Sequence, residues 1–351
     1  MTTVRLVLIG LGNLGLRFCR LLEDKRTYLR QRYGLDLMLV GAADSGGAAY
    51  DPVDGLDPSQ IVAIKTGGRS IAHYPDAGEE NWLAPALVAT AQADVLLESS
   101  PVNLDQGAEP GLSSIRTALR RGMHVSTPNK GPLVVAYSEL HELAEAHDAE
   151  LRFDGTVAGG LPALYLGQRD LRGALIERIA AVPNLCTGYV MDMLADGMSW
   201  DDATAQAREA GVLEGDGSWD LEGWDAAAKL VILANGVLSQ PTTMDDVHRT
   251  GITGLTPDQL RSAQERDERY RLLASAEREA DGSYALSVAP VPLPADHPLG
   301  RLGRKQMGVS YETDIYGTIT AIIDEPSPVP SAATMLRDVL DIYSSSIRRE
   351  T

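Results

Sequence analysis

Asp225 and Lys229 are the charged residues of this sequence whose spacing first suggests catalysis. They are four residues apart in the stretch from Glu214 to Leu233, which places both side chains on one face of a helix. Trp224 and nearly all of residues 226–233 are apolar, and a helix that is apolar nearly all round is mostly buried. A buried carboxylate and ammonium must find partners or line a cavity, because an unpaired charge without water is costly. The alternative is a surface ion pair that contributes roughly a few tenths of a kcal/mol.

The helix that carries this pair has recognisable ends. An acidic loop with Gly215 and Gly217 precedes it, and the helix is expected to begin after Asp220 or Gly223. Asn235-Gly236 at the other end favours a left-handed helix stop.

Lys130 is a further candidate because of its place in the sequence Thr127-Pro128-Asn129-Lys130-Gly131-Pro132. This segment is predicted to be a stiff turn at the carboxyl end of a strand, and ligands of open α/β sheets bind at that edge. A lysine between two prolines is held in place better than most solvent lysines are. The alternative is an ordinary surface turn. The glycine-rich loop 155–162 is also expected to bring its backbone close to another group.

A dinucleotide site is predicted near the N-terminus, where Gly10-Leu11-Gly12-Asn13-Leu14-Gly15 follows the apolar run Val4–Ile9. A lone GxGxxG pattern is weak, but this one lies between an expected strand and an expected helix, and Asp44 ends the next expected strand. In such a site Gly10 permits the tight turn, Gly12 lets the pyrophosphate approach the backbone, and Gly15 packs the helix on the strand. The pyrophosphate lies on the helix N-terminus. The alternative is an ordinary turn between strand and helix.

Composition excludes several classes of function. The 351 residues are enough for two domains, and the net charge of −18 argues against a nucleic-acid or acidic-membrane partner. Cys19 and Cys186 lie far apart, and neither the cysteines nor the histidines have disulfide-framework or metal-site spacing, so no metal is expected. The run from Val4 is expected to be a strand rather than a signal peptide, and no apolar run reaches the ~18 residues of a membrane helix. The expected location is a reducing compartment, the cytoplasm.

The expected elements divide into two patterns. Strands alternate with helices in the first half of the chain, which is typical of a parallel sheet: strands 4–9, 35–43, 94–98, 123–126 and 151–153, with helices 16–29, 112–121 and 137–148. The second half has strands that alternate like antiparallel ones, and helices between them: strands 176–182, 283–288, 308–313 and 318–323, with helices from about 163, at 200–210, at 257–279 and at 332–347.

The four motifs, residues 10–15, 127–132, 155–162 and 214–233, occur in this order in homoserine dehydrogenases, which the chain resembles over nearly its whole length. It is most similar to the short form that lacks an aspartate kinase and a regulatory domain. The resemblance implies an α/β fold with three parts: an N-terminal Rossmann-type doubly wound parallel sheet that binds the dinucleotide, residues 1–130; a mixed α/β substrate and dimerisation domain, residues 131–325; and a C-terminal helix that returns to the nucleotide domain, residues 326–351.

The activity that the resemblance implies is reversible hydride transfer between a nicotinamide and aspartate semialdehyde, giving homoserine, in amino-acid biosynthesis. Lys229 would be the general acid, because an ammonium beside a carbonyl stabilises the charge that develops on its oxygen. Lys130 would lie between cofactor and substrate. The residues that would hold the amino-acid substrate are Glu214, Asp220, Asp225, Thr187 and Gly159. The protein would be a homodimer.

The implied cofactor is NAD, with NADP possible. Asp44 can accept hydrogen bonds from the adenosine ribose, and its charge repels a 2′-phosphate, although Lys65 could reach in and offset it. The expected cofactor-binding residues are Gly10, Leu11, Gly12, Asn13, Leu14, Gly15, Asp44, Ser99, Ser100 and Lys130.

The chain departs from the family at two segments near the expected substrate site. Residues 184–189 read Asn-Leu-Cys-Thr-Gly-Tyr where the family usually has Asn-Gly-Thr-Thr-Asn-Tyr, and residues 323–328 replace a glycine-rich segment with Ile-Asp-Glu-Pro-Ser-Pro. The acidic loop also lacks a common proline. Residues 185–188 lose a threonine hydroxyl and an asparagine amide and gain the bulk of Leu185, and Asp324 and Glu325 would add negative charge if they face the cleft. Homoserine is therefore expected to be a weak substrate, and a compound with a different or less polar tail a better one. The alternatives are a solvated surface turn at 324–325, an enzyme for another small aldehyde or alcohol, and a non-catalytic dinucleotide sensor.

Overall fold

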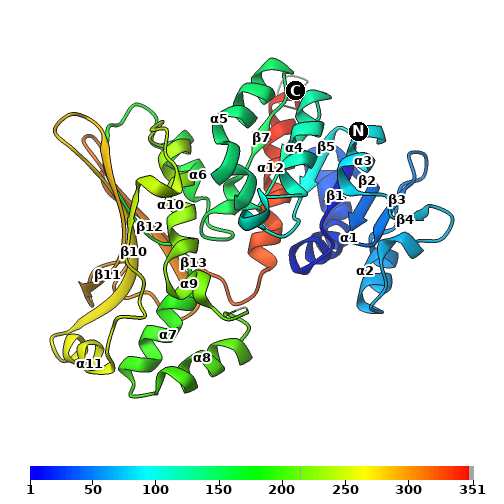
Figure 1. The fold of residues 1–351 in the computed structure, drawn as a ribbon. Helices are drawn as coiled ribbons and strands as arrows, with labels where there is room; N and C mark the ends of the chain where they lie inside the picture. Colours follow the sequence, from blue (N-terminus) through cyan, green and yellow to red (C-terminus); the bar gives the residue numbers. More distant parts are fainter. Residues whose placement is uncertain (214, 348–351) are drawn as a thin grey trace. The chain divides into compact units, whose positions relative to one another are not determined.

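The chain folds into two units (Figure 1). The structure, a computed structural model, describes residues 1–213 and 215–347, with side chains as far as residue 343. The first unit comprises Met1–Gly160 and Ser327–Thr351, and the second comprises Leu161–Pro326. The first boundary thus falls later than residue 130, where the sequence placed it, because helix α5 (Lys130–Ala146) and strand β7 (Leu151–Arg152) continue the first sheet and its cover.

Within the described residues, the first unit is built on a seven-stranded sheet in the order β4-β3-β2-β1-β5-β6-β7. Strands β2, β1, β5, β6 and β7 run parallel, which confirms the Rossmann-type sheet, whereas β3 and β4 extend it in the antiparallel sense and were not predicted. The strands are β1 (Thr2–Ile9), β2 (Leu35–Asp44), β3 (Gly47–Tyr50), β4 (Gly78–Glu80), β5 (Val95–Glu98), β6 (His124–Ser126) and β7.

Helices cover both faces of this sheet. On one face, Leu6 and Leu8 of β1 pack against Phe18 of α1 and Met335 of α12, two helices that lie side by side. Val7, which alternates with them on β1, is also fully buried, as expected of a strand in a parallel sheet. The described helices of this unit are α1 (Asn13–Tyr33), α2 (Pro58–Thr66), α3 (Ala84–Thr90), α4 (Gly111–Arg120), α5 and α12 (Val329–Ile347), with 3₁₀ turns at Ile71–His73, Leu104–Gln106 and Asp154–Thr156.

The second unit contains a mixed sheet in the order β13-β12-β8-β10-β11-β9, where β11 and β9 form the only parallel pair among the residues that the structure describes. Helices α7, α10 and α11 pack on the central strand β10. The strands are β8 (Ile176–Val182), β9 (Val247–Arg249), β10 (Glu268–Arg278), β11 (Tyr284–Pro294), β12 (Gln306–Thr313) and β13 (Gly317–Asp324). The helices are α6 (Ala163–Tyr165), continued by a π turn at Leu166–Asp170, α7 (Leu185–Ala195), α8 (Trp200–Glu209), α9 (Ser218–Leu221), α10 (Trp224–Gly236) and α11 (Pro257–Glu265), with a 3₁₀ turn at Met244–Asp246.

Three local predictions were wrong. The helix expected over 257–279 ends at Glu265, and residues 268–278 form β10, because its apolar residues are buried in the middle of the sheet. The segment 127–132 is only partly a turn, since Lys130 opens α5 and the Asn129 side chain caps that helix. Asn235-Gly236 makes no left-handed stop, because α10 continues through Gly236 and ends at Val237 in a right-handed conformation. None of the described helices combines the length and the apolar character needed to span a lipid bilayer.

Candidate active site

The turn between β1 and α1 has the geometry of a pyrophosphate cradle. Gly10 has φ +89°, and a Cβ there would overlap the backbone of Ser99. A Cβ on Gly15 would overlap the carbonyl oxygen of Gly10, whereas a Cβ on Gly12 would meet nothing within 4 Å. Two of the glycines are therefore required by close packing, and the third leaves open space at the start of the helix, as the dinucleotide fingerprint requires.

The N-terminus of α1 is suited to an anion. Gly12 caps the helix without a side-chain hydrogen bond, so the first N–H groups are not satisfied by a cap. Ser99 Oγ donates to the carbonyl oxygens of Ile9 and Gly10 at 3.1 and 2.9 Å, which fixes the turn beneath the helix. Leu11 is buried, and Asn13 and Leu14 lie in the first turn of α1. These residues fit a bound dinucleotide.

Asp44 ends β2 as predicted, but protein donors already surround its carboxylate. Lys65 Nζ lies 2.5 Å from Oδ2, and Ser70 Oγ donates to Oδ1 at 2.7 Å. The backbone N–H groups of Gly46 and Ile71 donate at 2.8 and 3.0 Å. Burial by itself would raise the pKa of Asp44, but the hydrogen bonds from these four groups outweigh it and lower that pKa. Asp44 is therefore ionised at neutral pH, and Lys65 is close enough to offset its charge.

The carboxyl ends of β5 and β6 contain a buried polar network that the sequence did not reveal. Glu98 is fully buried and accepts hydrogen bonds from the Ser100 N–H at 2.8 Å and from Thr127 Oγ1 at 3.1 Å. Burial raises the pKa of Glu98, and hydrogen bonds from Ser100, Asn129 and Thr127 oppose that rise. Asn129 Oδ1 accepts the Gly131 N–H at 3.0 Å and caps α5, whose first residue is Lys130. The network thus holds the helix end that carries Lys130.

In the second unit, Lys229 and Asp225 form the predicted pair on α10. Lys229 Nζ lies 2.7 Å from Asp225 Oδ2 and donates to the Pro183 carbonyl oxygen, also at 2.7 Å. The exposed fractions of the two side chains are only 14% and 6%, so the surface alternative is excluded. An ammonium held at two acceptors, with a third N–H available, is a suitable proton donor for a substrate oxygen.

Asn184 joins this cluster and was not predicted as a site residue. Its Nδ2 donates at 2.6 Å to Asp220 Oδ1 and at 2.6 Å to Asp225 Oδ2. Its Oδ1 caps α7 by accepting the N–H groups of Cys186 and Thr187. Asp220 was predicted to support the carboxylates of the protein that hold the substrate. The Asn184 amide connects it to Asp225.

Among the described residues, the others predicted to bind the substrate do not belong to the cluster of Lys229, Asp225 and Asn184. Thr187 is buried in the first turn of α7, and its Oγ1 has no hydrogen-bond partner among the residues described. Gly159 has φ +57° and belongs to the first unit, as does Lys130. Glu214 lies outside the described residues. Cys186 is buried, and burial, with the nearby Asp220 and Asp225, raises the pKa of its thiol, so it is no nucleophile.

The residues that depart from the family pattern differ in how buried they are. Leu185 begins α7 and is half-buried, and a Cβ on Gly188 would meet nothing within 4 Å. Asp324 is exposed at the end of β13, whereas Glu325 is buried. The surface-turn alternative therefore holds for Asp324, whose charge is solvated, but not for Glu325.

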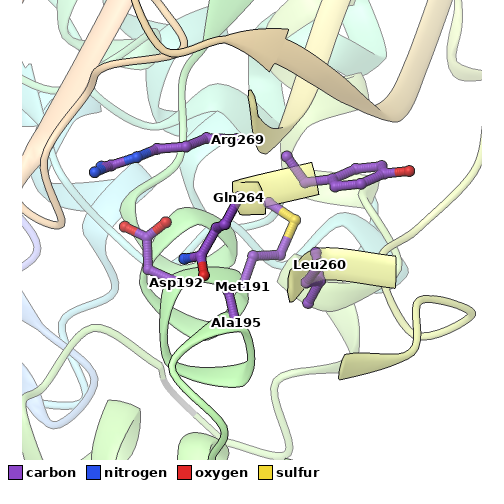
Figure 2. A pocket seen from close by; sticks show the side chains of 7 residues that line it. Met191, Asp192, Ala195, Leu260, Gln264 and Arg269 are labelled. Carbon is purple, nitrogen blue, oxygen red and sulfur yellow. The ribbon is translucent and has the colours of Figure 1, made fainter. Parts of the chain in front are cut away.

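A small, partly open pocket lies elsewhere in the second unit, between α7, α11 and β10 (Figure 2). Asp192, Gln264 and Arg269 line it with apolar neighbours. Asp192 is already paired with Arg271 at 2.8 Å. The pocket brings together none of the predicted site residues.

Comparison with known proteins gives a consistent result over the chain. The family model described as the homoserine dehydrogenase NAD-binding domain matches residues 10–154, and the homoserine dehydrogenase model matches residues 162–340. A homoserine dehydrogenase of Methanocaldococcus jannaschii is 33% identical over 342 residues, 97% of this chain and 99% of that protein. An NAD(+)-dependent homoserine dehydrogenase of Pseudomonas canavaninivorans is 30% identical over 350 residues, 100% of this chain and 99% of that protein. The fold also matches a hyperthermophilic archaeal homoserine dehydrogenase in complex with NADPH, with a TM-score of 0.81, 24% identity and 97% of each chain covered.

Proposed function

The chain belongs to the homoserine dehydrogenase family, and from that premise we propose how its residues carry out NAD(P)-dependent interconversion of aspartate semialdehyde and homoserine. The observation that carries the assignment of roles is the buried cluster of Lys229, Asp225 and Asn184. A bound nicotinamide supplies the hydride for reduction or accepts it in oxidation.

Lys229 is the proton donor in this proposal. In the reductive direction its ammonium faces the aldehyde oxygen, stabilises the charge developing there and transfers a proton to it. Asp225 holds the ammonium of the lysine in place by an ion pair at 2.7 Å. The Pro183 carbonyl fixes the direction of the side chain. Lys130 is a second candidate on the first unit, at the start of a helix that the Glu98 network holds in place.

The carboxylates of the site bind the amino group of the substrate. Asp225 and Asp220 are joined by Asn184 and offer negative charge to an ammonium group. Glu214 is assigned to the same role from the sequence alone. A substrate with an amino group is therefore favoured over a plain hydroxy acid or aldehyde.

NAD(H) is the preferred cofactor in our proposal, and NADP(H) is also accepted. Asp44 is ionised at the end of β2, where its charge disfavours a 2′-phosphate. The Lys65 ammonium beside it weakens that repulsion, so the preference should be modest. One relative is named as NAD(+)-dependent, and a solved structure of the same fold is described as a complex with NADPH, which agrees with use of both.

The two rival functions are less well supported. A sensor without catalysis has no need of a buried ammonium held at two acceptors. A different substrate was expected from the changes at 185–188 and from the charges at 324–325. Asp324 is exposed, however, and the relatives named as homoserine dehydrogenases match the chain over nearly their whole length. We therefore set aside the expectation that homoserine is a weak substrate.

We also propose that the protein is a cytoplasmic homodimer. Both cysteines are free and buried, which suits a reducing compartment. Ile315, Tyr316, Ile322 and Leu175 are exposed apolar residues near the edge strand β13, a feature that suits pairing with a second copy. Light scattering should give twice the chain mass, and Ile322→Asp with Ile315→Asp should lower it to the mass of one chain.

The function is tested by incubating the purified protein with homoserine and NAD⁺. We expect NADH absorbance to appear together with an equal amount of aspartate semialdehyde. Failure of the well-folded protein to oxidise homoserine with either NAD⁺ or NADP⁺ would overturn the proposal.

A further inference from the structure

We propose that Asn184 is a positioning residue of this active site, which orients the carboxylates of Asp220 and Asp225 for the substrate amino group. The inference rests on the proposed function, since it assigns a role within the same site. Asn184 lies at the junction of β8 and α7, and its two carboxylate partners come from α9 and the first turn of α10.

Only one orientation of the Asn184 amide satisfies its neighbours. Its oxygen accepts the backbone N–H groups of Cys186 and Thr187 at 2.7 and 3.3 Å. Its nitrogen therefore points the other way and donates to Asp220 and Asp225, each at 2.6 Å. Turning the amide over would set an oxygen against two carboxylates and an NH₂ group against two N–H donors. The helix cap thus fixes which atom the carboxylates meet.

A neutral double donor suits a site that must hold two carboxylates close together. Like charges repel at short range, and Lys229 already offsets part of the charge of Asp225. A second lysine in place of Asn184 would remove more of the negative charge that attracts the substrate ammonium. Asn184 adds no charge, and each of its N–H groups makes a charge-assisted hydrogen bond. Asp220 and Asp225 can therefore stay close together and still attract the ammonium of the substrate.

The same junction also holds the proton donor. Pro183, the residue before Asn184, accepts the hydrogen bond from Lys229 Nζ at 2.7 Å. Asp225 Oδ2 receives hydrogen bonds from both Asn184 and Lys229. Loss of the Asn184 donor would therefore disturb substrate binding and the placement of the ammonium together.

A role as helix cap alone is the competing explanation, and two variants separate it from positioning. Asn184→Ser keeps a good cap for α7 but cannot reach two carboxylates. Asn184→Asp keeps the cap and the shape, and replaces the NH₂ group by an oxygen that faces Asp220 and Asp225. Ser199→Ala is the matched control, because Ser199 caps α8 by accepting the Asp202 N–H in the same unit. NADH binding by each variant verifies that the nucleotide site is folded.

We expect Asn184→Ser to lose roughly 10- to 100-fold in kcat/KM, the effect of one to two charge-assisted hydrogen bonds, mainly through a higher KM for the amino-acid substrate. Asn184→Asp should lose at least as much. With NADH deuterated at the transferred position, both variants should show a larger isotope effect than the wild type, because the chemical step has become slower relative to product release.

The inference would be overturned if Asn184→Ser had the same KM and isotope effect as the wild type and Ser199→Ala. Asn184 would then act as a helix cap alone. A wild-type protein without homoserine activity would instead remove the proposed function, and the inference with it. An active wild type with unaffected Asn184 variants removes the inference alone.

Discussion

Replacement of Lys229 by alanine tests the proposed proton donor separately from the rest of the site. The change removes the Nζ atom that donates to Asp225 and to the Pro183 carbonyl. Alanine is the best helix former, so α10 itself should not be weakened. Loss of a general acid typically costs about 10²- to 10⁴-fold, and we expect kcat to fall within that range. NADH binding should be unchanged, because the glycine turn belongs to the first unit.

The stability of this variant can also be worked out from the structure. Removing one partner of a buried ion pair usually costs ~3–5 kcal/mol, because the other charge is left uncompensated. Asp225 still receives the Asn184 hydrogen bond, and Lys229 is 14% exposed, so that water can replace its ammonium. We therefore expect a smaller loss, about 1–3 kcal/mol in the free energy of unfolding. Asp225→Asn in the Lys229→Ala background should restore stability but not turnover.

The assay is steady-state oxidation of homoserine, followed as NADH absorbance, with urea unfolding and NADH titration on the same samples. The matched control is Lys305→Ala, which removes an exposed lysine from the same unit. Turnover of Lys229→Ala within a few-fold of this control would refute the assignment, and Lys130→Ala would then be the variant to test.

Three further outcomes are expected. The dissociation constant should be lower for NADH than for NADPH, and Lys65→Met should widen the difference by removing the charge that offsets Asp44; tighter binding of NADPH to the wild type would contradict this. Burial lowers the pKa of His124 below its ordinary 6.5, although Glu150 and other carboxylates oppose the shift. As the pH decreases below 6.5, the unfolded chain therefore binds a proton at this histidine before the folded chain does, and the melting temperature should decrease. The decrease should be smaller in His124→Gln. Asp324→Asn should leave the KM for homoserine unchanged, since Asp324 is exposed; a marked fall in KM would place its charge near the substrate.

Much of the first unit could be predicted because its signals are local. A continuous apolar run such as Val4–Ile9 identifies a strand buried on both faces, and the glycine spacing that follows requires the turn that the structure contains. The pair of Asp225 and Lys229 could also be predicted, because two residues four positions apart lie on the same face of a helix. A serine directly before an expected helix is another local signal, and Ser199 does cap α8.

The rest depends on tertiary contacts that no local pattern encodes. Residues 268–278 contain many good helix formers, and only their pairing with β8 and β11 makes them a strand. Asn184 meets Asp220 and Asp225 across 36 and 41 residues, and Glu98 meets Thr127 across 29, so no spacing rule connects them. The sequence showed Asn184 as the first residue of a divergent segment, and its amide became meaningful only when the partners were known.

The central claim is tested most directly by the substrate preference of the purified protein. The kcat/KM for homoserine should be compared with those of a panel of small amino and hydroxy compounds, each with NAD⁺ and NADP⁺. We predict that homoserine leads, with a value of about 10⁴ M⁻¹s⁻¹ or higher, as for a physiological substrate. A hydroxy compound without an amino group that exceeded homoserine tenfold would contradict the assignment of Asp220 and Asp225 as its binding groups.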